Sequence, residues 1–153
     1  MGFAVANFGG TVPGGAGSDT HGGSGGAPSA LTITNSTFTN IGRIGVLTKG
    51  TGATATLTGN TYTGKGNGTF LDYAFEFGAG GSGTVSGNTI SGNRGIASDT
   101  STSAGILVTD YYGTGTSATI ENNIITNNTD GIAVGYDETD NSTVVVHNNE
   151  FSG

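Results

Sequence analysis

One short pattern recurs five times along the chain and constrains its fold more than any other feature. Each copy has an aliphatic residue, two spacers, a polar residue, one spacer and a large apolar residue. The aliphatic residues lie 24, 28, 35 and 26 positions apart, at Ile33, Leu57, Val85, Ile120 and Val146. Hairpin arrays have loops of only a few residues, whereas stacked coils return to the same chemistry after tens of residues. The spacing therefore predicts a solenoid.

A second motif lies between these copies and predicts further strands. It is a small residue followed by an apolar residue, a spacer and another residue able to face inward, at 2–5, 45–48, 74–77, 105–108 and 131–134. Alternation with period two is typical of a strand with one buried face. Together with the two halves of the first pattern, this gives three short strands in each coil.

The polar residue of the first pattern has a physical reason to recur. It is Asn in four copies and Ser in the first, and the five residues are Ser36, Asn60, Asn88, Asn123 and Asn149. Strands in a sheet lie about 4.8 Å apart, so amides stacked at that spacing can donate to and accept from one another. We therefore predict a ladder of hydrogen bonds. The alternative is that Asn only suits a tight turn, because it tolerates a left-handed backbone.

With these motifs the chain resembles the right-handed parallel β-helices of the pectate-lyase type. The resemblance covers about residues 31–153 and the strand at 2–5. It implies an all-β fold with three sheets, called A, B and C here, and an Asn corner that joins a sheet B strand to a sheet C strand. The second motif belongs to sheet A, and the handedness comes from the resemblance alone.

The domain organisation follows from the placement of these motifs. We expect a single domain over residues 1–153, about five coils, and a Gly-rich loop insertion at 6–30. We also expect the chain to start and stop partway round a coil. In that arrangement the first coil has only a sheet A strand and the last has only sheets B and C.

Composition excludes several classes of protein. Gly, Thr and Asn are abundant and are poor helix formers, and no apolar run approaches the roughly 20 residues of a membrane span. The chain has no Cys, which excludes disulfides and thiolate metal sites. A net charge of −7 argues against nucleic acid as a partner. This composition is typical of secreted or cell-surface proteins.

The resemblance implies that a substrate groove would run along sheet A and its flanking loops. We expect the outward positions there to be Ala4, Leu47, Glu76, Leu107 and Ala133, a mostly small and apolar face. It lacks the paired carboxylates of a glycoside hydrolase and the cluster of Asp with Lys or Arg of a lyase. We therefore predict no catalytic residue. If the protein is a lyase or hydrolase, the best candidates are Arg43, Lys49, Glu76 and Asp110.

The loops that follow the sheet A strands hold the richest chemistry. Tyrosines beside carboxylates can stack on sugar rings and accept hydroxyl hydrogen bonds, so the candidate ligand-binding residues are Asp110, Tyr111, Tyr112 and Tyr136. Calcium prefers six to eight oxygen ligands, and the candidate metal ligands are Asp137, Glu138 and Asp140. The alternative is a solvated acidic loop, and we predict no other cofactor.

The outward positions of the sheet B strands carry a Thr-x-Thr pattern, as at Thr32 and Thr34 or Thr56 and Thr58. Regular arrays of this kind on a flat solenoid face can bind ice. The pattern stops after three of the five coils, and Thr is in any case a good strand residue.

These observations leave functions of different classes open. The first hypothesis is a non-enzymatic structural or adhesive module that assembles head to tail into fibres, with a second copy of itself as partner. The alternatives are a polysaccharide lyase or hydrolase, or part of one, and a carbohydrate-binding module that uses the loops beside sheet A.

Overall fold

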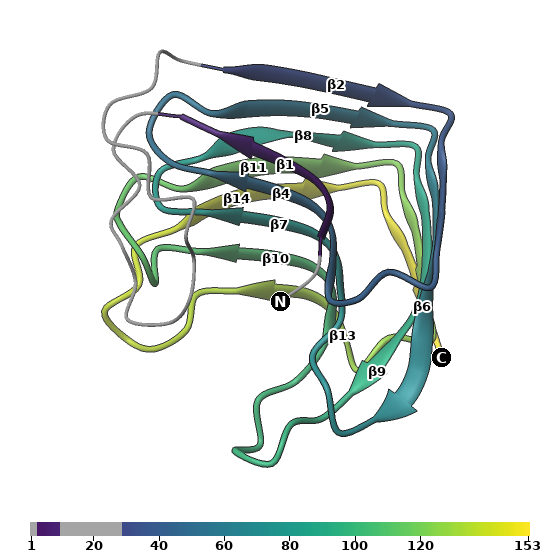
Figure 1. Cartoon of the computed structure of the whole chain (residues 1–153). Coiled ribbons are helices and arrows are strands. Elements are labelled where there is room, and N and C mark those ends of the chain that lie inside the picture. The colour runs from purple at the N-terminus through teal and green to yellow at the C-terminus, as the bar shows by residue number, and fades with distance from the viewer. Residues whose placement is uncertain (1–2, 10–28) are drawn as a thin grey trace.

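The computed structural model describes residues 3–9 and 29–153 (Figure 1). Within these residues the chain forms strands and no helix. Every coil of the chain contributes one strand to each of three five-stranded sheets. The coils stack as layers, and every pairing between strands is parallel. The predicted all-β parallel solenoid is therefore confirmed.

The strands follow one another in the order A, B, C along the chain. Sheet A consists of β1 (Phe3–Phe8), β4 (Ile44–Lys49), β7 (Tyr73–Gly78), β10 (Ala104–Thr109) and β13 (Asp130–Val134). Sheet B consists of β2 (Ala30–Thr34), β5 (Thr54–Thr58), β8 (Ser82–Ser86), β11 (Ser117–Glu121) and β14 (Thr143–His147). Sheet C consists of β3 (Thr37–Thr39), β6 (Thr61–Gly68), β9 (Thr89–Gly95), β12 (Ile124–Thr126) and β15 (Glu150–Ser152).

The prediction that the first and last coils are incomplete is wrong. The first coil contains β1, β2 and β3, and the fifth contains β13, β14 and β15, so each has a strand in all three sheets. The error arose because the long stretch between β1 and β2 separates the first strand from its own coil in the sequence. No strand from a second molecule is needed to complete a triangle.

The first strand also differs from its predicted bounds. β1 runs to Phe8 and β2 begins at Ala30, so residues 6–8 and residue 30 belong to strands and not to the insertion predicted at 6–30. Its inward position at residue 7 is occupied by Asn7, which is buried and donates from Nδ2 to the carbonyl oxygen of Thr54 at 2.8 Å. Because a polar residue occupies this inward position, the alternation of apolar residues in the sequence stops before the strand does. Residues 10–28 of the predicted insertion lie outside the described residues.

The core fills the triangle between the three sheets with side chains stacked in rows. One row contains Leu57, Val85 and Ile120 from sheet B, and another contains Tyr62, Ile90 and Ile125 from sheet C. All of these are 2% exposed or less. The rings of Phe75 and Phe77 enter from sheet A. Each row runs from coil to coil, so each side chain packs on its counterpart in the next coil.

A ladder of Asn side chains runs through the corner between sheets B and C. The Nδ2 of Asn60 donates to Oδ1 of Asn88 at 3.0 Å, Asn88 donates to Asn123 at 2.9 Å, and Asn123 donates to Asn149 at 2.9 Å. Each Oδ1 also accepts the backbone N–H of the ladder residue one coil earlier, beginning with Ser36. The second Nδ2 hydrogen is satisfied as well, because it reaches the carbonyl oxygen of a sheet B strand end.

The residue just before each ladder residue has a left-handed backbone. Its φ is between 50° and 66° in all five coils, at Asn35, Gly59, Gly87, Asn122 and Asn148. Only Gly and Asn adopt this conformation readily, which explains why no other residue type occurs there. The two roles that the sequence offered for Asn therefore belong to two adjacent positions, the turn at the first and the ladder at the second.

We predict that Asn88→Ala lowers the free energy of unfolding by about 3 kcal/mol or more, because it leaves several buried donors and a carbonyl without partners. Asn149→Ala is the matched control. It removes the same group at the half-buried end of the ladder, where water can replace the lost bonds. Urea denaturation of the two variants measures the difference. Equal losses would contradict a ladder whose strength depends on burial.

Candidate functional site

The outer face of sheet A carries side chains in lateral rows, fixed by the strand register. The central row contains Ala6, Leu47, Glu76, Leu107 and Ala133. Ala6 takes the place predicted for Ala4, because β1 pairs with β4 two residues further along than the motif alignment implies. The neighbouring row holds Ile44, Tyr73 and Ala104, which pack with Leu47 as an apolar cluster on this face.

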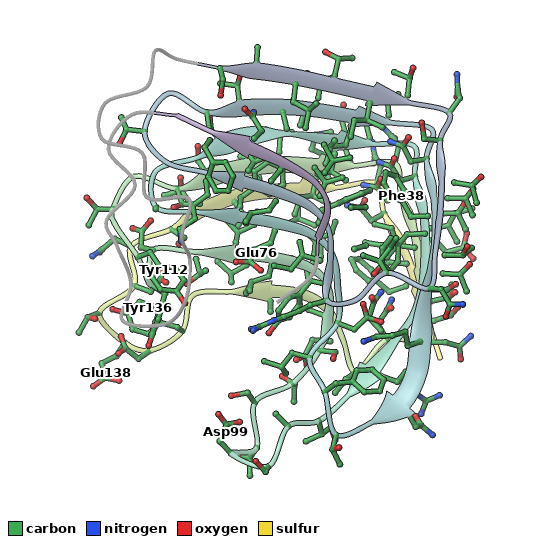
Figure 2. All side chains as sticks on the ribbon, in the orientation of Figure 1. Phe38, Glu76, Asp99, Tyr112, Tyr136 and Glu138 are labelled. Atoms are coloured by element: carbon green, nitrogen blue, oxygen red, sulfur yellow. The ribbon has the colours of Figure 1, made fainter. Side chains whose placement is uncertain are left out.

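A groove of about 470 Å³ lies over this face. Its floor is formed by sheet A, including Leu47 and Glu76. The loop at 99–102 forms one side, where the chain enters sheet A, and the tyrosine loops form the other, where it leaves. Figure 2 shows Glu76 on the sheet, with Asp99 on the loop before the strands and Tyr112 and Tyr136 beyond their ends. The groove is therefore flanked by the two variable corners of the solenoid.

The three predicted tyrosines come together at one end of this groove. The ring of Tyr111 stands at right angles to those of Tyr112 and Tyr136, with centroid distances of 4.6 and 4.9 Å. Tyr111 is 58% exposed and Tyr136 is 48% exposed. The Nζ of Lys49 lies 4.0 Å from the centroid of the Tyr112 ring, a cation–π contact. The cluster joins two loops of adjacent coils and leaves two ring systems open to a ligand.

Asp110, which was predicted to bind ligand beside the tyrosines, is engaged within its own turn. Its side chain is buried, and its Oδ1 accepts the backbone N–H of Thr116 at 2.9 Å. Its Oδ2 accepts the N–H of Gly115 at 3.4 Å. The carboxylate therefore shapes the loop that presents Tyr111, and it does not line the groove.

Asp140 joins the two tyrosine loops. Its Oδ2 accepts the Oγ1 hydrogen of Thr109 at 2.9 Å and the N–H of Asp110 at 2.8 Å, while its Oδ1 accepts the N–H of Ser142 at 2.8 Å. The hydroxyl of Ser142 also donates to Oδ1. Partial desolvation favours the neutral acid, but these hydrogen bonds outweigh it and lower the pKa of Asp140 below its usual value.

The three predicted calcium ligands are not gathered around a common point. Asp137 accepts the N–H and the hydroxyl of Thr139 through its Oδ1, and Asp140 is occupied by the donors just described. Glu138 is exposed. Across the described parts of the chain, no group of three or more His, Asp or Glu side chains is placed to hold a metal ion. The arrangement gives the calcium prediction no support.

Charged groups lie on the groove floor and at its entrance. Lys49 and Glu76 are almost fully buried, and Arg43 directly precedes β4. The Cζ of Arg43 lies 5.8 Å from the centroid of the Tyr73 ring, and its Nε is buried without a hydrogen-bond partner. Three of the four residues weighed for catalysis, Arg43, Lys49 and Glu76, thus share one groove, and Asp110 does not.

Tyr73 lines the same groove and was not predicted. Its hydroxyl donates to the carbonyl oxygen of Thr102 at 3.3 Å. Burial raises the pKa of Tyr73 above its usual value, and the charge of Glu76 adds to this, although Arg43 opposes it. The phenol is therefore protonated at neutral pH and acts as a hydrogen-bond donor.

The loop at 99–102 was also missed, although the sequence contains a signal for it. The interval from Val85 to Ile120 is the longest between copies of the repeat. The extra residues form an extension after β9 that is closed by an antiparallel bridge between Ile96 and Thr102. An unusually long interval thus marks the coil that carries a wall of the groove.

Comparison with known proteins identifies the repeat but not a ligand. A family model described as a right handed beta helix region matches residues 17–153. Searches of curated proteins and of solved structures each found no match. Among the described residues, no helix has the length and apolar character that a membrane crossing requires.

We predict that Asp140→Asn loosens the tyrosine cluster, because an amide cannot accept all the donors that meet at this carboxylate. Near-ultraviolet circular dichroism of the tyrosines should weaken, while the far-ultraviolet signal of the sheets stays. Wild type should lose the same signal only in acid. A depressed folded-state pKa gives stability that is complete above the ordinary Asp pKa and is lost as pH falls through the folded value. A tyrosine signal unchanged in Asp140→Asn would show that Asp140 does not hold the two tyrosine loops together.

Proposed function

The chain belongs to the right-handed β-helix family, and we propose that it serves as a non-enzymatic adhesive module that binds a polysaccharide in the sheet A groove. The observation that supports this proposal most directly is the tyrosine cluster at the end of that groove. We place the module in a secreted or cell-surface protein, on the basis of its Gly-, Thr- and Asn-rich composition. A long solenoid with a lateral groove suits an extended ligand, because the floor repeats along the axis.

The chemistry of the groove suits sugars. Exposed aromatic faces, such as those of Tyr111 and Tyr136, stack on the apolar faces of sugar rings. Tyr73 supplies a phenol, Glu76 supplies an acceptor and Arg43 supplies donors for hydroxyl groups. An apolar floor with a few polar groups at set positions is the usual composition of a ligand site.

Binding without turnover is favoured over catalysis by how the polar groups are used. Asp110 is held in its turn, and Lys49 faces the Tyr112 ring. Tyr73 is kept protonated, which removes it as a base at neutral pH. The remaining enzyme hypothesis rests on Arg43 and Glu76 as an acid–base pair.

The triple replacement of Tyr111, Tyr112 and Tyr136 by Ala should abolish retention on a glycan array, because it removes the stacking surface. Phe151→Ala is the matched control. It removes an aromatic ring that is 51% exposed but lies in the fifth coil on sheet C, away from the groove. Retention that survives the triple replacement would overturn the groove as the binding site.

A direct assay separates binding from turnover. Uronate polymers incubated with the wild-type chain should show no rise in the ultraviolet absorbance of unsaturated products, with and without Ca²⁺. A rise that Glu76→Gln removes would replace the adhesive proposal with a lyase.

A second candidate function is end-to-end assembly of the module with itself into fibres. It is favoured by the fifth coil, where Val134, Val146 and Phe151 are 50%, 46% and 51% exposed. The strands of this coil, β13, β14 and β15, each form the edge of their sheet, and such edges pair readily with another chain. At the opposite edge β2 and β3 have the same lengths as β14 and β15, so a second copy can continue the stack in register.

For this candidate, light scattering of the wild-type chain should show particles that grow with protein concentration. Phe151→Asp should be monomeric, because a charge on the exposed core row blocks stacking. Glu150→Ala, which changes the neighbouring outward residue, should assemble as wild type does. A wild-type monomer at all concentrations would remove this function and leave the groove proposal intact.

A further inference from the structure

The outer faces of sheets B and C carry an array of hydroxyl groups in the first three coils. In the second coil four of the outward residues are Thr56 and Thr58 on β5 and Thr61 and Thr63 on β6, the ones nearest the Asn corner. In register with them the first coil has Thr at all four positions, and the third has Thr, Ser, Thr and Ser. We call these twelve positions the hydroxyl lattice. The eight lattice positions of the first two coils are all occupied by exposed Thr side chains.

Strand propensity alone does not explain the lattice. Thr favours strands in any sheet, yet the outward row on sheet A contains Leu47, Glu76 and Leu107 and no hydroxyl. Exposed sheet faces usually carry charged residues for solubility, and the lattice has none. Charges enter the same rows only in the last two coils, with Glu121, His147 and Glu150. The chain thus concentrates neutral hydroxyl groups on one part of its surface.

The backbone beneath the lattice repeats regularly both from strand to strand and along each strand. Neighbouring strands lie about 4.8 Å apart, and outward residues within one strand lie about 6.6 Å apart. Sheets usually twist, and flat ones are held by stacking or side-chain ladders. Here the Asn ladder runs along the corner between the two faces. Figure 1 shows the strands of sheet B stacked almost parallel, so the hydroxyl groups repeat without accumulating a large rotation.

We propose that the hydroxyl lattice binds crystalline water. Each Thr offers one donor, two acceptor positions and a methyl group, so it can hold a water molecule by hydrogen bonds while the methyl group restricts the neighbouring water. A grid of such groups orders water with its own period, and the two spacings of the lattice are close to the repeats of hexagonal ice. Charged side chains would impose a different hydration, and they are absent from the lattice.

The ligand proposed for the hydroxyl lattice differs from the polysaccharide proposed for the groove. The lattice contains no aromatic residue, and stacking on sugar rings needs one. The tyrosine cluster is carried by the loops that follow sheet A, whereas the lattice lies on the outer faces of the other two sheets. The inference therefore stands whether or not the groove binds a polysaccharide.

The test is the uptake of the full chain into ice grown slowly from a dilute solution, together with microscopy of single ice crystals. Wild type should enter the ice and shape the crystals, and an unrelated soluble protein should be excluded. Thr56→Lys and, on the other face, Thr61→Lys should each lose uptake, with thermal melts showing that both variants are folded. The matched control is Val145→Lys, which places the same charge in the row of Thr56 but in the fifth coil, outside the lattice.

Three results would overturn the proposal. The first is exclusion of the wild-type chain from ice. The second is full uptake of folded Thr56→Lys and Thr61→Lys. The third is loss of uptake when Tyr111, Tyr112 and Tyr136 are replaced by Ala, because ice would then bind at the groove. Uptake by wild type and Val145→Lys, but not by the lattice variants, supports it.

Discussion

The hydrogen bond from one Asn side chain to the next is the interaction on which the rest of the molecule depends. A buried amide is costly unless all its groups are satisfied, and here the side chains of Asn88 and Asn123 each donate along the ladder and to a carbonyl oxygen and accept two hydrogen bonds at Oδ1. These bonds form only when successive coils are in register at this corner. The ladder therefore fixes how the coils stack, and the apolar rows of the core align as a consequence. Solenoids are stabilised by such contacts between neighbouring coils.

The same constraint decides where functional groups can lie. The corner between sheets B and C cannot accept extra residues, because the ladder residue follows the left-handed turn directly in every coil. Insertions are confined to the other two corners, where the loop at 99–102 and the tyrosine loops grow. These loops rise on both sides of sheet A and make a groove of its outer face. The outer faces of the two sheets that meet at the ladder carry the hydroxyl lattice.

The fold could be predicted from the sequence because every coil needs the same residues at the corner between sheets B and C, and these residues recur as a pattern. The pattern located the ladder positions and all three sheets, and it failed where one residue served another purpose. Asn7 on the inner face of β1 concealed the end of that strand. For this reason the motif placed Ala4 at the outward position that Ala6 occupies. The site was predicted less completely. The tyrosines were found by type, but Asp110 turned inward and Tyr73 joined the groove through tertiary packing that no local pattern reports.

Hydrogen exchange of the native protein tests the central role of the ladder most directly. The backbone amides of Asn60 and Asn88 donate to side-chain oxygens and not to a neighbouring strand. If the ladder holds the coils together, these amides should exchange only through global unfolding, as slowly as those in the core of sheet B. Exchange as fast as that of the amide of Glu138, in the exposed loop after β13, would show that the corner opens without global unfolding and would contradict a central role for the ladder.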